Sequence, residues 1–161
     1  MDTSKITSME KIASFAILVA VYNGSEYLKR CLDSLLQQTL KDIQVICIDD
    51  GSTDNSWEIL QSYAAIDRRI EILHLSQNYG AAHARNEGIK LINARYTTFL
   101  DCDDTFAPDA LEQALQVFDK HPQVDCVLFK LLTLGGGNST AQEYDMDFFE
   151  ERSGYEAFKD S

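Results

Sequence analysis

Basic residues are scarce in this chain of 161 residues, where 14 Lys and Arg stand against 26 Asp and Glu and give a formal net charge of -12. This balance argues against a nucleic-acid partner, because binding to that backbone depends on Lys and Arg that neutralise phosphates. It does not exclude a small phosphate ligand, provided that a metal ion supplies the positive charge.

The chain also lacks the cysteine spacing of a zinc site. Its four cysteines are far apart in the sequence, and no Cys-x-x-Cys occurs. Cys47 and Cys126 lie in hydrophobic runs, so we expect both to be buried core residues, which suits a reducing cytosol. No apolar stretch approaches the ~20 residues of a membrane span. Residues 1–14 form a polar leader without the apolar region of a signal peptide, so we expect a cytoplasmic protein.

Hydrophobic runs alternate with segments of helical periodicity along the rest of the chain. Strands are expected over residues 15–21, 42–48, 69–75 and 96–100, with another strand-like run over 124–132. The first helix is expected to begin after Ser25 as an N-cap, and the second after Asp54 or Ser52 as its cap. Two further helices are expected over residues 81–94 and 108–120. This alternation predicts an α/β fold, a mainly parallel sheet with helices on both faces, in one domain over residues 15–132.

Polar residues follow three of these strands at the point where each ends. Ligands of such sheets bind beyond the carboxyl ends of the strands, so one crevice should collect these side chains. They are Tyr22-Asn23, Asp49-Asp50 and Asp101-Cys102-Asp103.

Three of the four residues from 101 to 104 are acidic, at the end of a strand that we expect to be buried and hydrophobic. Like charges resist such crowding, and a divalent cation would relieve it; oxygen ligands suit Mg²⁺ or Mn²⁺. The alternative is an acidic loop without a ligand. Asp49 or Asp50 could accept a hydrogen bond from a nucleobase N–H, or could cap the following turn. Arg85 could contact a diphosphate, orient the cluster through Asp101 or Asp104, or form a surface ion pair.

Taken together and in order, these segments resemble the family-two glycosyltransferases of the GT-A fold. The matching segments are residues 19–23, 32–39, 48–54, 78–80, 84–88 and 99–104. The resemblance implies a Rossmann-like nucleotide-sugar-binding domain, a UDP-sugar as the most common donor, and Mn²⁺ or Mg²⁺. It implies nucleotide-binding roles for Ala20, Val21, Asn23, Asp50, Arg85, Asp101 and Cys102, with Asp50 at the base. It implies that Asp103, supported by Asp101, holds the metal.

The resemblance further implies an inverting transfer to a carbohydrate or lipid-linked acceptor, as in the synthesis of cell-envelope polysaccharides. Ala20 departs from the family, which usually has proline there, and residues 135–161 contain no convincing catalytic-base motif. We therefore expect the donor-binding portion of a longer protein. Residues 133–161 would start its acceptor side, the base would lie outside the chain, and the full-length protein would associate peripherally with the inner face of the membrane.

Three other interpretations of the sequence are also open. The order Asp101-Cys102-Asp103-Asp104-Thr105 also resembles the nucleophile motif of haloacid-dehalogenase-type phosphatases, although that family carries the motif on its first strand. The segment Ile48-Asp49-Asp50 superficially resembles the acidic site of a receiver-like binding domain. The third alternative is a nucleotide-sugar-binding fragment that lacks its catalytic base.

Overall fold

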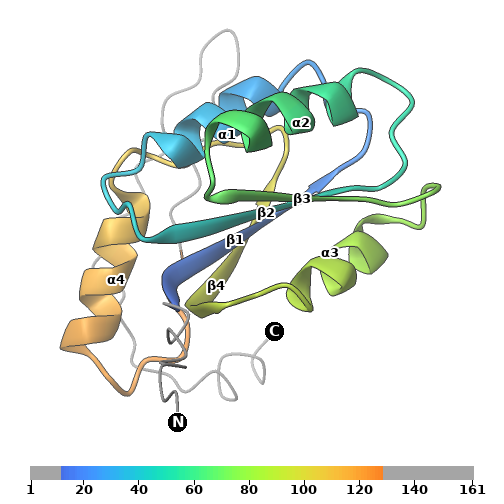
Figure 1. The fold of residues 1–161 in the computed structure, drawn as a ribbon. Helices are drawn as coiled ribbons and strands as arrows, with labels where there is room; N and C mark the ends of the chain where they lie inside the picture. The colour runs from blue at the N-terminus through green and yellow to red at the C-terminus, as the bar shows by residue number, and fades with distance from the viewer. Residues whose placement is uncertain (1–11, 129–161) are drawn as a thin grey trace, which may run out of the picture. The chain divides into compact units, whose positions relative to one another are not determined.

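A computed structural model describes residues 12–128, in which strands and helices alternate (Figure 1). The strands are β1 (Ala13–Val21), β2 (Ile43–Asp49), β3 (Ile70–His74) and β4 (Ala94–Asp101), and the helices are α1 (Leu28–Leu36), α2 (Ser56–Ile66), α3 (Ala81–Ile89) and α4 (Ala110–Lys120). The strands form one sheet in the order β3-β2-β1-β4, and each neighbouring pair is parallel. The predicted α/β class is confirmed.

The centre of the sheet is buried on both faces, as its Val- and Ile-rich runs predict. All seven residues of β2 are buried. Helices α1 and α2 lie on one face of the sheet and α3 on the other (Figure 1). On the α3 face, Leu18, Ile46, Ile48 and Ala84 pack into one apolar cluster. This core holds β1 and β2 in place, and the loops that follow the two strands begin beside it.

The expectation that the fourth strand is fully buried is wrong. β4 occupies an edge of the sheet within residues 12–128 and pairs with β1 alone. Its exposed and less exposed residues alternate, and Phe99 is 47% exposed. The physical reason is that α3 packs on β1 and β2, which leaves every second side chain of β4 without cover.

Several boundaries and burials also differ from the predictions. Ser25 does not cap the first helix, because the N–H groups of Tyr27 and Leu28 both donate to the carbonyl of Gly24 and form a turn before α1. The third helix ends at Ile89, five residues early, because β4 begins at Ala94. Cys47 is buried as expected.

The segment after α4 departs further from expectation. Cys126 is exposed, not buried. Residues 124–128 form no strand, because within the described residues no strand lies beside them as a hydrogen-bonding partner. The remainder of the strand-like run, the boundary at residue 132 and the region 133–161 lie outside the described residues.

The chain divides into two compact units, Met1–Leu111 and Glu112–Ser161. All four strands and helices α1 to α3 belong to the first unit. β1 begins at Ala13, two residues inside the predicted polar leader.

Two glycines adopt positive φ angles beside the carboxyl edge of the sheet, Gly51 at 69° and Gly80 at 92°. A Cβ atom on Gly51 would lie 2.5 Å from the backbone carbonyl carbon of Gln77 and 2.8 Å from the backbone nitrogen of Asn78. A Cβ atom on Gly80 would meet nothing within 4 Å. The loop after β2 therefore packs backbone to backbone against the loop before α3, and only glycine permits this approach.

We expect Gly51→Ala to lower the free energy of unfolding more than Gly80→Ala does. Gly80→Ala carries only the cost of a strained backbone conformation, about 1–3 kcal/mol. Gly51→Ala carries a similar cost and also overlaps a backbone that cannot rotate away. Urea unfolding of both variants measures the difference, and equal losses of stability would contradict the close packing of the two loops.

Candidate functional site

The acidic cluster begins at the exposed end of β4. Arg85, on α3, donates from Nη2 to Oδ1 of Asp101 at 2.6 Å, and the two side chains are 36% and 60% exposed. The N–H of Asp104 donates to the carbonyl of Asp101 at 3.0 Å and closes a turn. The carboxylate of Asp103 is exposed and has no hydrogen-bond or ion-pair partner among residues 12–128. Of the roles considered for Arg85, the structure shows the pairing with Asp101.

The loops after β1 and β2 are joined by hydrogen bonds between side chains and backbone. Asn23, at a φ of 51°, accepts at Oδ1 from the N–H of Thr53 at 2.8 Å, and its own N–H donates to Ser52 Oγ at 3.0 Å. The N–H of Gly24 donates to Ser56 Oγ at 2.9 Å, a buried bond. The side chain of Asn23 therefore serves the neighbouring loop. A ligand at this edge would meet two loops that act as one surface.

Asp54 completes this junction. Its Oδ2 accepts from the N–H of Ser25 and its Oδ1 from the N–H of Ser56, both at 3.0 Å. Ser56 is the first residue of α2, so Asp54 satisfies an otherwise unpaired donor of the helix start. The sequence indicated a cap at this position, but it did not indicate the link to the first loop.

Asp50 holds a third loop in place. Its N–H donates to the carbonyl of Val21 at 2.8 Å, and its carboxylate accepts from the N–H groups of Tyr79 and Gly80 at 2.9 and 2.8 Å. Asp50 is 2% exposed. Each carboxylate oxygen keeps a second lone pair, so a nucleobase N–H could share one of them. The predicted contact between Asp50 and a base stays a prediction.

Asp49 is the last residue of β2, and its side chain is buried on the opposite side of the sheet from that of Asp50. Its Oδ2 lies 2.6 Å from Nδ1 of His74, and its buried Oδ1 has no partner in the described part of the chain. The ring of His74 lies 4.9 Å from that of Trp57. Asp49 and Asp50 are both buried, and the predicted contact of either carboxylate with a ligand in the crevice stays a prediction. The sequence patterns did not single out His74. Its position at the end of β3, in parallel register with Asp49 at the end of β2, is the feature that could have identified it.

The other predicted nucleotide-binding residues differ in what they can offer a ligand. The side chain of Val21 is fully buried, so only its backbone is available. Ala20 is half-buried, in register with both Ile48 and Asp101. Cys102 is half-buried against Gly24, where an added Cβ atom would lie 2.8 Å from its Sγ. Burial raises the pKa of the Cys102 thiol, as do the nearby carboxylates of Asp103 and Asp101.

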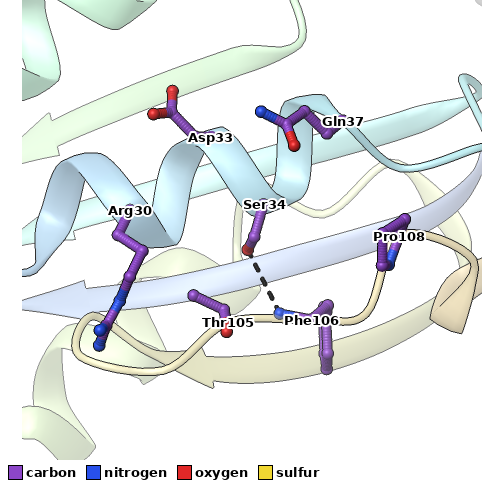
Figure 2. A pocket seen from close by; sticks show the side chains of 7 residues that line it. All are labelled: Arg30, Asp33, Ser34, Gln37, Thr105, Phe106 and Pro108. Atoms are coloured by element: carbon purple, nitrogen blue, oxygen red, sulfur yellow. Dashed lines mark hydrogen bonds between the residues drawn. The ribbon is translucent and has the colours of Figure 1, made fainter.

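A pocket of about 420 Å³ lies between α1 and the segment after the acidic cluster (Figure 2). Its lining residues are Arg30, Asp33, Ser34, Gln37, Thr105, Phe106 and Pro108. None of them was predicted to contact a ligand. Figure 2 shows Arg30 extending from α1 toward the loop, and Ser34 facing the backbone of Phe106.

The residues at the edge fit a metal ion that a ligand also binds better than one that protein side chains bind alone. Residues 12–128 contain no group of three or more His, Cys, Asp or Glu side chains that could hold a metal ion. Asp101 and Asp103 offer exposed carboxylate oxygens, and Mg²⁺ commonly takes one or two carboxylates together with substrate phosphates. The set therefore fits a cation that arrives with a phosphate ligand. Within the same residues, no helix is both long and apolar enough to cross a membrane.

Comparison with known proteins gives a consistent result. The model of the glycosyl transferase family 2 matches residues 16–158. The poly(ribitol-phosphate) beta-glucosyltransferase of Bacillus spizizenii is 36% identical over 124 residues, which cover 75% of this chain and 19% of that protein. Two further curated relatives are matched over 29% and 34% of their lengths, so this chain spans about a third or less of such relatives.

Two solved structures share the fold. The structure of S. aureus TarS 1-349 in complex with UDP is 28% identical, with a TM-score of 0.64, and the match covers 68% of this chain and 33% of that one. The mannosyltransferase PcManGT from Pyrobaculum calidifontis, in complex with GDP-Man and Mn2+, is 20% identical with a TM-score of 0.62, covering 73% and 36%. The second likeness shows the fold alone.

The junction formed by Asp54 predicts a pH dependence of stability. Burial opposes the effect, but hydrogen bonds from Ser56 and Ser25 lower the pKa of Asp54 to about 2. A carboxyl with a lowered pKa in the folded state stabilises the fold above its unfolded pKa and loses that contribution as the pH falls. We expect the stability difference between the native chain and Asp54→Asn to shrink from about pH 4 to about pH 2. Urea midpoints across this range test it, and parallel pH profiles would contradict it.

Proposed function

The chain belongs to the glycosyl transferase family 2, and we propose that it binds a nucleotide-sugar donor at the carboxyl edge of its sheet. In the whole protein, the sugar would pass from this donor to an acceptor hydroxyl. The observation that carries the proposal is the meeting of the loops after β1, β2 and β4 at one edge, with Arg85 already paired to Asp101.

A UDP-sugar is the donor that we favour. The TarS structure was solved in complex with UDP and shares 28% identity with this chain. Asn23 and the backbone of Val21 would line the nucleoside, and Asp50 would accept from the base N–H through a free lone pair. Cys102 and Ala20 would flank the nucleotide. Arg85 would stay within reach of the diphosphate, because its partner Asp101 is the last residue of β4.

Asp103 and Asp101 would hold Mn²⁺ or Mg²⁺ together with the diphosphate. When bound, the metal would act as a Lewis acid toward the charge that develops on the leaving diphosphate. The PcManGT structure contains Mn2+, which is a property of that protein. In the described part of this chain, the carboxylate of Asp103 is exposed and has no partner, which supports the role.

We further propose an inverting transfer. The acceptor hydroxyl would attack the anomeric carbon, the bond from that carbon to the diphosphate oxygen would break, and a carboxylate outside this chain would take the hydroxyl proton. The acceptor would be a carbohydrate or a lipid-linked carbohydrate of the cell envelope. The full-length protein would work in the cytoplasm, peripherally at the inner face of the membrane.

A second candidate is donor binding without transfer. This chain spans about a third or less of the curated relatives considered above, and donor binding is the part of the activity that its described loops support directly. Release of free UDP from a UDP-sugar with Mn²⁺, assayed with and without carbohydrate acceptors, separates the two roles. The phosphatase and receiver-like alternatives are set aside, because the family match accounts for the segments that they leave unexplained.

We expect Asp103→Asn to remove most of the Mn²⁺-dependent affinity for UDP. Loss of an outer-shell partner of a metal commonly costs about 10- to 100-fold, and a direct ligand should cost at least as much. Folding should be unaffected, because the side chain is exposed. Calorimetry with UDP, with and without MnCl₂, measures the effect.

Asp104→Asn is the matched control for this experiment. It removes the same charge from the next residue, whose exposed side chain has no hydrogen-bond or ion-pair partner among residues 12–128. UDP affinity in the presence of Mn²⁺ should remain near that of the native chain. Unchanged affinity in Asp103→Asn would remove the proposed metal role, and equal losses in both variants would reduce it to a general charge effect.

A further inference from the structure

Polar side chains along α1 bind the backbone of the segment that follows the acidic cluster. Arg30 donates from Nη2 to the carbonyl of Asp103 at 2.9 Å. Ser34 Oγ accepts from the N–H of Phe106 at 3.2 Å (Figure 2). Residues 30 and 34 are four apart and so share one face of the helix. We call Arg30, Ser34 and Gln38, which continues this row just past the helix end, the α1 cradle.

Gln38 fixes the far end of the segment. It is fully buried, and its Nε2 donates to the carbonyl of Ala107 at 2.7 Å and to that of Ser34 at 3.1 Å. Its Oε1 accepts from the N–H of Leu111 at 3.2 Å. Every hydrogen-bonding group of a buried amide is thus directed at the backbone, which is the arrangement that makes such a residue costly to replace. The segment's far end cannot shift without breaking these bonds.

The near end is held differently. Cys31 Sγ lies 3.8 Å from the carbonyl of Asp101, and burial raises the pKa of this thiol to about 12, so it acts as a weak neutral donor. The exposed Arg30 supplies the stronger contact. The carboxylate of Asp103 has no partner of its own in the described chain, so its position depends on its backbone. Arg30 is the side chain that binds that backbone.

We propose that Arg30 is a positioning residue that, with the rest of the α1 cradle, sets where the carboxylate of Asp103 stands relative to Asp101. The inference rests on the proposed function only in that Asp103 is taken to contact the metal and donor. Arg30 itself touches neither; it acts through the main chain. Gln38 binds the backbone at Ala107 and Leu111, and Arg30 binds it at Asp103, so the α1 cradle holds the segment at two separate points.

Charge and geometry predict opposite effects of removing Arg30. A cation beside a cation site repels the metal, so loss of its charge alone would raise the affinity for Mn²⁺. Loss of a positioning contact would lower that affinity, because outer-shell partners of a metal site commonly contribute about 10- to 100-fold. The sign of the change therefore distinguishes the positioning role from simple electrostatics.

The experiment compares Arg30→Ala, Arg30→Lys and Lys29→Ala by calorimetry with UDP, with and without MnCl₂. Lys29 is an exposed cation on the same turn of α1 that makes no hydrogen bond to the acidic turn within the described residues, and it serves as the matched control. We expect Arg30→Ala to weaken Mn²⁺-dependent UDP binding by about tenfold or more. Metal-free UDP binding should be unchanged, Arg30→Lys should recover part of the loss, and Lys29→Ala should bind like the native chain.

A second measurement needs no ligand. Hydrogen–deuterium exchange over residues 101–108 should be faster in Arg30→Ala than in Lys29→Ala, while exchange in β1 and β2 stays the same. Unchanged or tighter Mn²⁺-dependent binding in Arg30→Ala would overturn the inference, and so would unchanged exchange. If the native chain binds no UDP, the proposed function fails, and the exchange comparison alone decides whether Arg30 holds the turn.

Discussion

Parallel pairing of β1 with both β2 and β4 is the constraint on which the rest of the structure depends. The register places Val21 beside Asp49 and Ala20 beside Asp101, so the ends of three strands that are far apart in sequence reach the same edge. Both pairings are made by the backbone, and they follow from burial of β1 and β2 between helices on both faces. Shifting one strand by a single residue would turn its final side chain to the other face and dismantle the edge.

The polar residues at this edge divide into two kinds. Asn23, Asp50 and Asp54 direct their side-chain oxygens at backbone N–H groups of neighbouring loops; Asp50 is buried, Asp54 is partly buried and Asn23 is exposed. Asp101 and Asp103 stay exposed, and one of them pairs with Arg85. Residues of the first kind give the loops a fixed shape without any ligand, because unpaired backbone groups would otherwise be costly. Residues of the second kind are free to exchange a neighbour for a ligand.

The sequence was sufficient to predict the order of β1 to β4 and α1 to α4, because hydrophobic periodicity is a local property of the chain. It was also sufficient to predict the shared edge, because the carboxyl ends of parallel strands meet at one edge of a sheet. It was insufficient where a residue's role depends on a distant backbone. The motif residues Asn23 and Asp54 read as ligand contact and helix cap, yet each also spans two loops. The spacing of Arg30, Ser34 and Gln38 does not reveal what these side chains bind, since their partners are backbone carbonyl and N–H groups that every residue carries. The exposure of β4 depends on which strand lies at the edge, and a hydrophobic run alone does not reveal that.

The two arginines beside the acidic turn differ in how they affect its charge. Two arginines approach the acidic turn from different elements, and they treat it differently. Arg85 pairs with the carboxylate of Asp101, whereas Arg30 donates to a backbone carbonyl, so the carboxylate of Asp103 has no partner among residues 12–128. In a chain with a net charge of -12, an exposed carboxylate attracts cations in general and selects none. At the proposed metal site, selectivity would then come from geometry, since Mg²⁺ demands oxygen ligands at fixed directions. A turn whose backbone is held by α1 would supply such directions, and a diphosphate brought with the metal would supply the remaining oxygens.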